Sequence, residues 1–329
     1  MFKHAFAVFA LASVVGCQGH AQSTSDDAAW QRYLHVLRAS SLEWSTSQPF
    51  FIKAEYQLYD LDGNPSVKGT AEASWPATLL DPIRIHSSDL TVDEHSDYTR
   101  TYTREKYLVD QALESAMRPF RSATERKDFH LEPVGEEIGT VQIDCFSILP
   151  PGTQRTPSTT VYCTNSNNQI VDITGDQYVI AREDFRVFRN HEVPMDITVS
   201  YEEKRAISLH VTELDELQPN STVKSGLSIE ARTVRVPAAI VAGMALKQKQ
   251  PKYPFEAKMK KLSGTVVLAG IIGTDGKIAA LDVIASPNSL LSKSSLDAVR
   301  KWEYRPYLLN GKPVRMETTI SVNYSMGAD

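Results

Sequence analysis

A glycine-rich stretch that ends in a lysine, residues 270–277, comes closest in this chain to a phosphate-binding loop. Three glycines stand at three-residue spacing, and Lys277 follows the last of them. A nucleotide-binding P-loop needs glycine and Ser or Thr at two further positions, which here hold Ile271 and Ile278. The spacing G-x-x-G-x-x-G also differs from the G-x-G-x-x-G of dinucleotide sites. Because Asp275-Gly276 lies between two apolar runs, we predict a β-hairpin turn here.

The candidate metal-binding patterns are incomplete. Asp60, Asp62 and Asn64 have the spacing that opens a calcium loop, but Pro65 stands where that loop needs glycine, so a turn is expected. No histidine pair has the H-E-x-x-H spacing of a zinc site, and no G-x-S-x-G nucleophile motif occurs. We therefore predict no metal, no other cofactor and no enzymatic activity.

Two cysteines remain after the N-terminal region, Cys145 and Cys163. In an exported protein such a pair is expected to form a disulfide, which would stabilise the fold by about 3 kcal/mol. Two reduced, buried thiols are the alternative. Neither cysteine has the spacing of a redox or metal motif.

The first 21 residues have the pattern of an export signal. Ala5–Val15 is apolar but too short to cross a bilayer as a mature helix. Small residues before Gln22 predict cleavage at that point, so that residues 1–21 would be removed. A second reading stays open, in which the sequence before Cys17 is a lipoprotein signal and Cys17 becomes lipidated. A retained anchor is the third reading. Each reading places the protein in the cell envelope, and we expect the periplasm.

Charge and periodicity indicate a two-domain α+β protein. The formal net charge of −5 argues against nucleic acid as the main partner. Residues 26–217 predict a mostly antiparallel β domain with few helices, and residues 218–236 a polar connector. Strands are expected where residues alternate and helices where apolar residues repeat every three to four positions. The strands expected in this domain are 51–59, 68–75, 98–107, 140–149, 159–163, 169–173, 195–201 and 206–214. The helices expected here are 26–39 and 108–117.

The C-terminal domain, residues 237–329, has the clearest pattern. A short helix is expected over 254–262, strands over 264–273 and 277–286, a helix from Asn288 or Ser289 to about 301, and a strand over 314–324. Within the last strand, apolar or Thr side chains alternate with polar ones, which predicts one buried and one solvated face.

Over about residues 236–326, the chain resembles the TonB C-terminal domain family. The matching residues are Pro251–Pro254, Ala257, Gly264–Val266, Thr274–Lys277, Ser286-Pro287, Leu291, Ala298–Pro306, Asn310–Val314 and Ile320–Tyr324. The resemblance implies a ββαβ module with a three-stranded antiparallel sheet. It also implies that a segment of a transporter or other envelope protein pairs with an exposed sheet edge. The edge expected to dock a partner is formed by Arg315, Met316, Glu317, Thr318, Thr319, Ile320, Ser321, Val322 and Asn323.

Three functions follow from these resemblances. The first is a periplasmic adaptor that docks envelope proteins, and an outer-membrane transporter fits that description. The second is an energy transducer for TonB-dependent transport, although the leader and the β-rich first domain depart from a force-transducing protein. The third is a carrier of an apolar ligand or lipid, because the first domain resembles the curved sheets of periplasmic lipoprotein carriers. A membrane contact is expected only through a lipid anchor, and the oligomeric state stays open.

Overall fold

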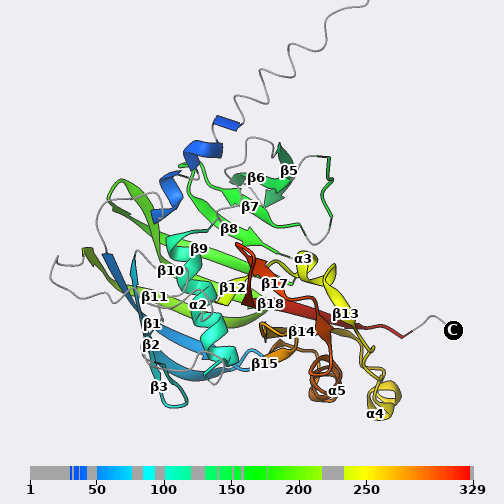
Figure 1. Ribbon diagram of the computed structural model, residues 1–329. Coiled ribbons are helices and arrows are strands. Elements are labelled where there is room, and N and C mark those ends of the chain that lie inside the picture. Colours follow the sequence, from blue (N-terminus) through cyan, green and yellow to red (C-terminus); the bar gives the residue numbers. More distant parts are fainter. Residues whose placement is uncertain are drawn as a thin grey trace, which may run out of the picture.

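The computed structural model of the chain describes residues 30–31, 33–36, 38–42, 50–75, 84–92, 101–119, 130–138, 141–149, 152–156, 159–175, 177–216 and 233–326. The predicted leader, Cys17 and most of the predicted connector lie outside these residues. Figure 1 shows a large curved sheet beside a smaller, C-terminal α+β unit.

The large sheet has eleven strands in the order β4-β3-β2-β1-β11-β10-β9-β8-β7-β6-β5, and each pair of neighbours is antiparallel. This confirms the α+β class and the large antiparallel sheet. Of its strands, β3, β4, β5 and β9 had not been predicted. The strands are β1 (Phe50–Tyr59), β2 (Pro65–Trp75), β3 (Arg84–Ser87), β4 (Thr91–Val92), β5 (His130–Ile138), β6 (Val141–Leu149), β7 (Val161–Thr164), β8 (Ile170–Thr174), β9 (Tyr178–Phe188), β10 (His191–Tyr201) and β11 (Lys204–Glu216).

The alternation of side chains along β1 correctly predicted which face of that strand is buried. Ile52, Ala54, Tyr56 and Leu58 are buried, and the residues between them are exposed or half-buried. The predicted N-terminal helix is also confirmed in its described part, since residues 30–31, 33–36 and 38–40 are helical. Its apolar side chains join the core of the curved sheet.

The strand expected over 98–107 is wrong in its described part, because helix α2 (Arg104–Met117) begins there. Thr103 is the N-cap residue, and its hydroxyl accepts a hydrogen bond from the Lys106 amide at 3.3 Å. Aromatic and polar residues alternate up to Tyr107, and that pattern favoured a strand. The cap satisfies an amide at the helix N-terminus, and α2 then buries residues on nearly all sides.

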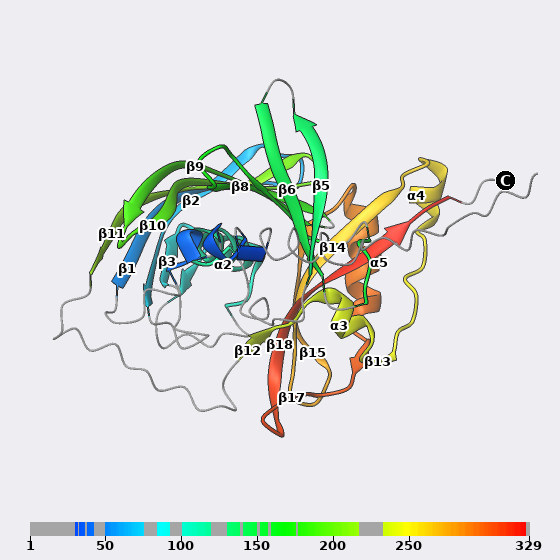
Figure 2. The same ribbon diagram turned by 90° about the horizontal axis from the view of Figure 1, so that it is seen from above.

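Helix α2 fills the concave face of the curved sheet. Figure 2 shows the sheet arching over α2, with the C-terminal strands across the open side. Leu108, Val109, Ala112, Leu113 and Ala116 are all fully buried there. The surface on which a carrier would hold an apolar ligand therefore packs against the protein's own helix.

The C-terminal unit contains a sheet of order β12-β18-β14-β15, with β17 also paired to β18. It is larger than the three strands that the resemblance implies, because β12 and β17 add to β18. β12 comes from the predicted connector and is parallel to β18. The elements are β12 (Thr233–Arg235), α3 (Ala238–Ala242), β13 (Ala245–Lys247), α4 (Phe255–Met259), β14 (Gly264–Ile272), β15 (Ile278–Ala285), α5 (Ser289–Val299), β16 (Glu303–Tyr304), β17 (Tyr307–Leu309) and β18 (Lys312–Tyr324).

The predicted turn between β14 and β15 is confirmed. Gly276 has φ +79°, a left-handed conformation that glycine adopts without strain. Its amide donates to the Gly273 carbonyl at 3.0 Å, and the Gly273 amide donates to the Lys277 carbonyl at 2.7 Å. The glycine-rich stretch thus forms a hairpin, and β16 contacts it because the Tyr304 amide donates to the Gly276 carbonyl at 2.9 Å.

Both faces of the C-terminal sheet are covered. Val266 and Leu268 of β14 pack in the core beneath α5, whereas Val267, Ala269 and Ile271 belong to the core of the curved sheet. The face predicted to be solvated is therefore buried in part by the first domain. The core of the curved sheet therefore includes side chains of β14 and β15, while the core beneath α5 is a separate cluster.

The predicted disulfide between Cys145 and Cys163 is confirmed. The two residues are direct cross-strand partners on β6 and β7, with a Cα–Cα distance of 4.0 Å. Both are buried, and Val134 and Val161 pack around them. The bond ties together two neighbouring strands near one end of the curved sheet.

Candidate partner-docking edge

The last strand, β18, has β14 on one side and the short strand β12 on the other. Its register with β14 is unbroken from Met316, opposite Ile272, to Tyr324, opposite Gly264. β17 forms a hairpin with the start of β18. On the side away from β14, β12 runs parallel to β18, with Thr233 opposite Arg315.

Within the described residues, no strand pairs with this second side of β18 beyond Glu317. The last backbone bond on that side in the described part of the chain joins the Val236 amide to the Glu317 carbonyl at 2.8 Å. Backbone groups in a strand alternate between its two sides. The amides and carbonyls of Thr319, Ser321 and Asn323 therefore point to the same side as the Glu317 carbonyl.

These three residues are also accessible at the level of their side chains. Ser321 and Asn323 are exposed and Thr319 is half-buried. The Thr319 carbonyl receives one long contact from the Thr318 hydroxyl at 3.4 Å. Residues 319–323 thus form an open edge segment about 15 Å long, which is enough for a short added strand.

The strand at the opposite edge of the sheet, β15, is capped near its C-terminal end by a residue of the first domain. Arg104, the first residue of α2, donates from its Nε to the Ile284 carbonyl at 3.0 Å and from its amide to Asp282 Oδ2 at 2.6 Å. Its Nη1 also donates to the Tyr59 carbonyl at 2.7 Å. Burial lowers the pKa of Arg104, and the charge of Asp282 opposes that effect. An added strand at this part of the edge would have to displace a half-buried arginine.

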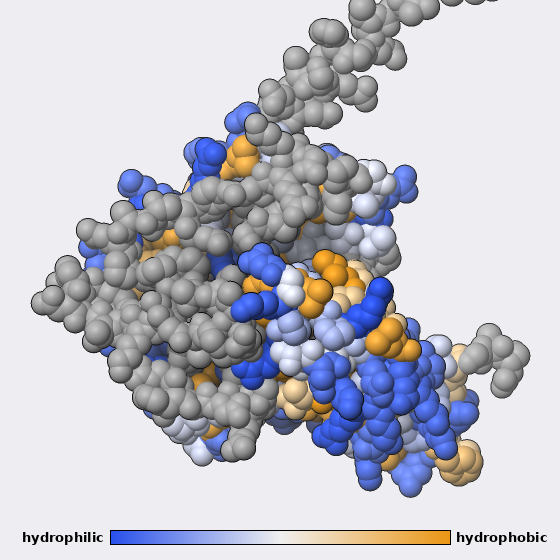
Figure 3. All heavy atoms as spheres, viewed as in Figure 1, coloured by the Kyte–Doolittle hydropathy of each residue, from blue (hydrophilic) through white to orange (hydrophobic). Residues whose placement is uncertain are grey.

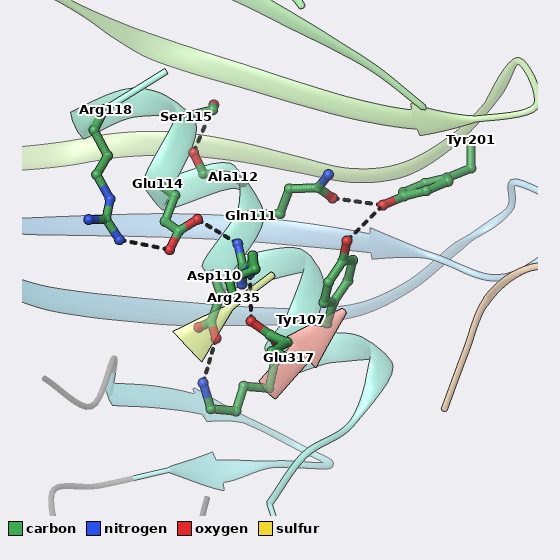
Figure 4. A network of polar contacts seen from close by, with 11 residues as sticks. Tyr107, Asp110, Gln111, Ala112, Glu114, Ser115, Arg118, Tyr201, Arg235 and Glu317 are labelled. Atoms are coloured by element: carbon green, nitrogen blue, oxygen red, sulfur yellow. Dashed lines mark hydrogen bonds and ion pairs between the residues drawn. The ribbon is translucent and has the colours of Figure 1, made fainter. Parts of the chain in front are cut away.

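A second arginine, Arg235 of β12, joins the two domains at the open edge. It donates to Glu317 Oε2 on β18 and to Glu114 Oε2 on α2, each at 2.5 Å. Figure 4 shows both carboxylates converging on this guanidinium. Its charge also lies over the ring of Tyr107, 5.5 Å from the centroid. We call Arg235, Glu114 and Glu317 the arginine clamp.

The clamp is strongly charge-assisted. Burial alone would lower the pKa of Arg235, but the carboxylates of Glu114 and Glu317 outweigh it and raise that pKa well above its ordinary value. Glu114 is held in addition by Arg118 at 3.0 Å. Close by on α2, burial raises the pKa of Asp110, although Lys106 at 2.6 Å opposes the shift. The clamp therefore keeps β12 and α2 against β18.

The residues predicted for the docking edge fall into three sets. Arg315, Met316 and Glu317 lie opposite β12 of the same chain, and Glu317 is only 3% exposed. Ile320 and Val322 are buried beneath α5, as their alternation predicted, and Thr318 is buried as well. Thr319, Ser321 and Asn323 remain at the open segment.

Sequence reasoning missed the arginine clamp and the cap formed by Arg104. Arg235 and Glu114 are 121 residues apart, so no local spacing links them. The one signal in the sequence is the alternation of Thr233–Val236, which a strand within a connector would produce.

This geometry defines a small α+β module that packs against a curved antiparallel sheet, and part of its last strand has no pairing strand among the described residues on one side. Residues 249–326 match the family described as Gram-negative bacterial TonB protein C-terminal. The match confirms the resemblance of this part of the chain to that family. None of the described helices is long and apolar enough to span a membrane.

Two curated relatives support the same assignment of the C-terminal part. Protein TonB of Vibrio cholerae serotype O1 is 26% identical over 112 residues, which cover 33% of this chain and 44% of that protein. Protein TonB of Xanthomonas campestris pv. campestris is 29% identical over 77 residues, covering 23% and 34% of the two chains. The similarity thus spans less than half the length of these relatives.

Two solved structures are similar to a larger part of the chain. A LolA superfamily protein from Nitrosomonas europaea has 11% identity and a TM-score of 0.34, and the alignment covers 56% of this chain and 93% of that one. A DUF1329 family protein from Desulfovibrio piger has 10% identity and a TM-score of 0.34, with 62% and 95% covered. TM-scores of this size do not establish a common fold.

Proposed function

We propose that this chain is an exported, TonB-like adaptor of the periplasm that captures an extended segment of an envelope protein on β18. The observation that carries the proposal is the open segment Thr319–Asn323, whose outward backbone groups continue the line of pairing that β12 begins. The match of residues 249–326 to the TonB C-terminal family supports it. A periplasmic segment of an outer-membrane transporter is the partner that this family suggests.

The proposed mode of binding is β-augmentation. β12 demonstrates that this side of β18 accepts a parallel strand, and the chain leaves the strand after Val236 because Pro237 starts α3. A partner segment then takes the place that β12 would have occupied. Its backbone pairs with Thr319, Ser321 and Asn323, and their side chains supply the sequence preference. The cap by Arg104 on β15 directs the partner to this one edge.

A pair of proline substitutions tests this mode. Ser321→Pro removes an amide that points outward, whereas Val322→Pro removes one that bonds to β14. We expect Ser321→Pro to leave the fold intact and to abolish partner capture. We expect Val322→Pro to destabilise the domain by about 3 kcal/mol or more.

Capture is measured with a photo-cross-linking residue at Asn323 in cells that make the protein, followed by mass spectrometry of the adducts. The proposal predicts one dominant envelope protein, whose adduct disappears in the Ser321→Pro background. An adduct that survives this substitution unchanged would show that the partner does not pair with β18.

A further inference from the structure

A corner of the C-terminal domain has a composition that edge pairing does not explain. Residues 245–262 contain six lysines and one acidic residue, Glu256, although the whole chain carries a net charge of −5. Four of these lysines, Lys252, Lys258, Lys260 and Lys261, lie on or next to α4 and are exposed. Together with Phe255 and Met259 we call them the α4 corner.

Two large apolar side chains protrude from the α4 corner. Phe255 is 76% exposed and Met259 is 69% exposed, which are the highest exposures among the large apolar residues in the described part of the chain. They are four positions apart and so lie on one side of the helix, while Ala257 between them is fully buried on the other. This helix therefore presents apolar side chains to solvent.

The surroundings of α4 are basic and convex. Figure 1 places α4 at the far corner of the molecule, and Figure 3 shows hydrophilic side chains gathered over that region with apolar ones at its margin. The Lys258 ammonium lies 5.6 Å from the centroid of the Tyr253 ring, and this cation–π contact holds one lysine of the corner in place. Lys247, by contrast, is paired with Glu303 at 2.9 Å and is not included.

We propose that the α4 corner is a membrane-contact site for a bilayer that contains anionic lipid. Charge complementarity selects an anionic partner, because the lysines surround the apolar pair with only Glu256 among them. Shape selects the bilayer over an acidic protein segment. Protruding side chains in protein interfaces fill pockets of the partner, and an extended acidic segment has no pocket for Phe255 and Met259. The lipid headgroup region accommodates such protruding apolar side chains. This contact does not depend on the proposed capture of a partner by β18.

The site is tested by sedimentation with lipid vesicles. The chain from Gln22 onward, the form expected after cleavage, is mixed with vesicles of phosphatidylcholine alone or with 30% phosphatidylglycerol. We expect binding only to the anionic vesicles, and weaker binding at high salt. The variant K258Q/K260Q/K261Q should lower the partition coefficient by on the order of 10- to 100-fold. The variant F255S/M259S should lower it by roughly tenfold.

Matched control variants distinguish binding through the α4 corner from nonspecific electrostatic or hydrophobic binding. K68Q/K277Q/K312Q removes the same charge from exposed lysines on other turns and strands, and V187S removes a side chain that is 67% exposed on the curved sheet. Both should bind like the unaltered protein. Equal loss in the controls, or equal binding to neutral vesicles, would overturn the proposal. So would tighter, α4-dependent binding to a soluble polyglutamate peptide, which would assign the corner to an acidic protein.

Depth of insertion gives an independent readout. The Phe255→Trp variant should show extra fluorescence that brominated lipids quench, since a side chain in the headgroup region lies within reach of the acyl bromines. No added quenching relative to the unaltered protein would place the residue outside the bilayer.

Discussion

Val236 donates its amide to the carbonyl of Glu317, while the neighbouring Arg235 holds the carboxylate of the same glutamate. Backbone pairing and the arginine clamp therefore meet at one residue of β18. Because Arg235 also binds Glu114 on α2, any movement of β12 away from β18 breaks a contact between the two domains. The open segment for a partner begins just after this point.

Loss of the arginine is expected to be costly. Arg235→Met leaves two carboxylates facing each other, one of them almost fully buried, so the free energy of unfolding should fall by about 3 kcal/mol. Urea unfolding measures the change. Lys247→Met is the matched control, since it breaks an exposed ion pair in the same domain and should cost less than about 1 kcal/mol. Equal losses would contradict a structural role for the clamp.

Two glycines in hairpin turns separate backbone strain from steric contact. Gly276 and Gly311 have nearly the same φ, +79° and +78°, so alanine at either position costs about 1–2 kcal/mol in strain. At Gly276 an added Cβ would also lie 1.9 Å from the Tyr304 carbonyl oxygen, whereas at Gly311 it would meet nothing within 4 Å. We expect Gly276→Ala to lower the melting temperature clearly more than Gly311→Ala. A similar effect at both sites would mean that β16 does not approach the turn.

Arg182 on β9 gives a prediction for pH dependence. Its side chain is fully buried, and its Nη1 donates to the Ile170 carbonyl at 2.9 Å. The guanidinium lies over the Phe185 ring, and the described residues offer no hydrogen-bond acceptor to its Nε or Nη2. Burial lowers its pKa from 12.5 to about 9. Between about pH 9 and pH 12.5 the unfolded chain binds more protons than the folded chain, so the free energy of unfolding rises with pH. This gain in stability is lost again as the pH falls through the pKa of Arg182 in the folded protein.

Replacing this buried charge should stabilise the protein. We expect Arg182→Met to raise the free energy of unfolding by about 1–4 kcal/mol near neutral pH. The gain should shrink between about pH 8 and about pH 10.5, measured by urea unfolding. Arg186→Met, on an exposed position of the same strand, should change stability by less than about 0.5 kcal/mol at either pH. A pH-independent gain at Arg182 would contradict the lowered pKa.

Local sequence patterns were sufficient to predict several elements of the fold. Asp275-Gly276 between apolar runs gave the hairpin of β14 and β15, and the alternation of residues 314–324 gave β18 with Ile320 and Val322 inside. These features depend on neighbouring residues, whose conformations and hydrogen bonds are set within a few positions. The helix predicted over 108–117 is likewise confirmed by α2, but the reasoning failed at residues 104–107, where alternation and helix capping compete and the cap at Thr103 prevails.

Only the tertiary structure decided which parts of the edge are open. Alternation marks Glu317 as a polar residue on a wet face, yet the first domain covers that face and Arg235 neutralises the carboxylate. Alternation also does not reveal that β12 covers Arg315–Glu317 or that Arg104 caps β15. Periodicity records whether a side chain prefers water or a core. Which distant segment supplies that core, or pairs with an edge, depends on packing between residues far apart in the chain.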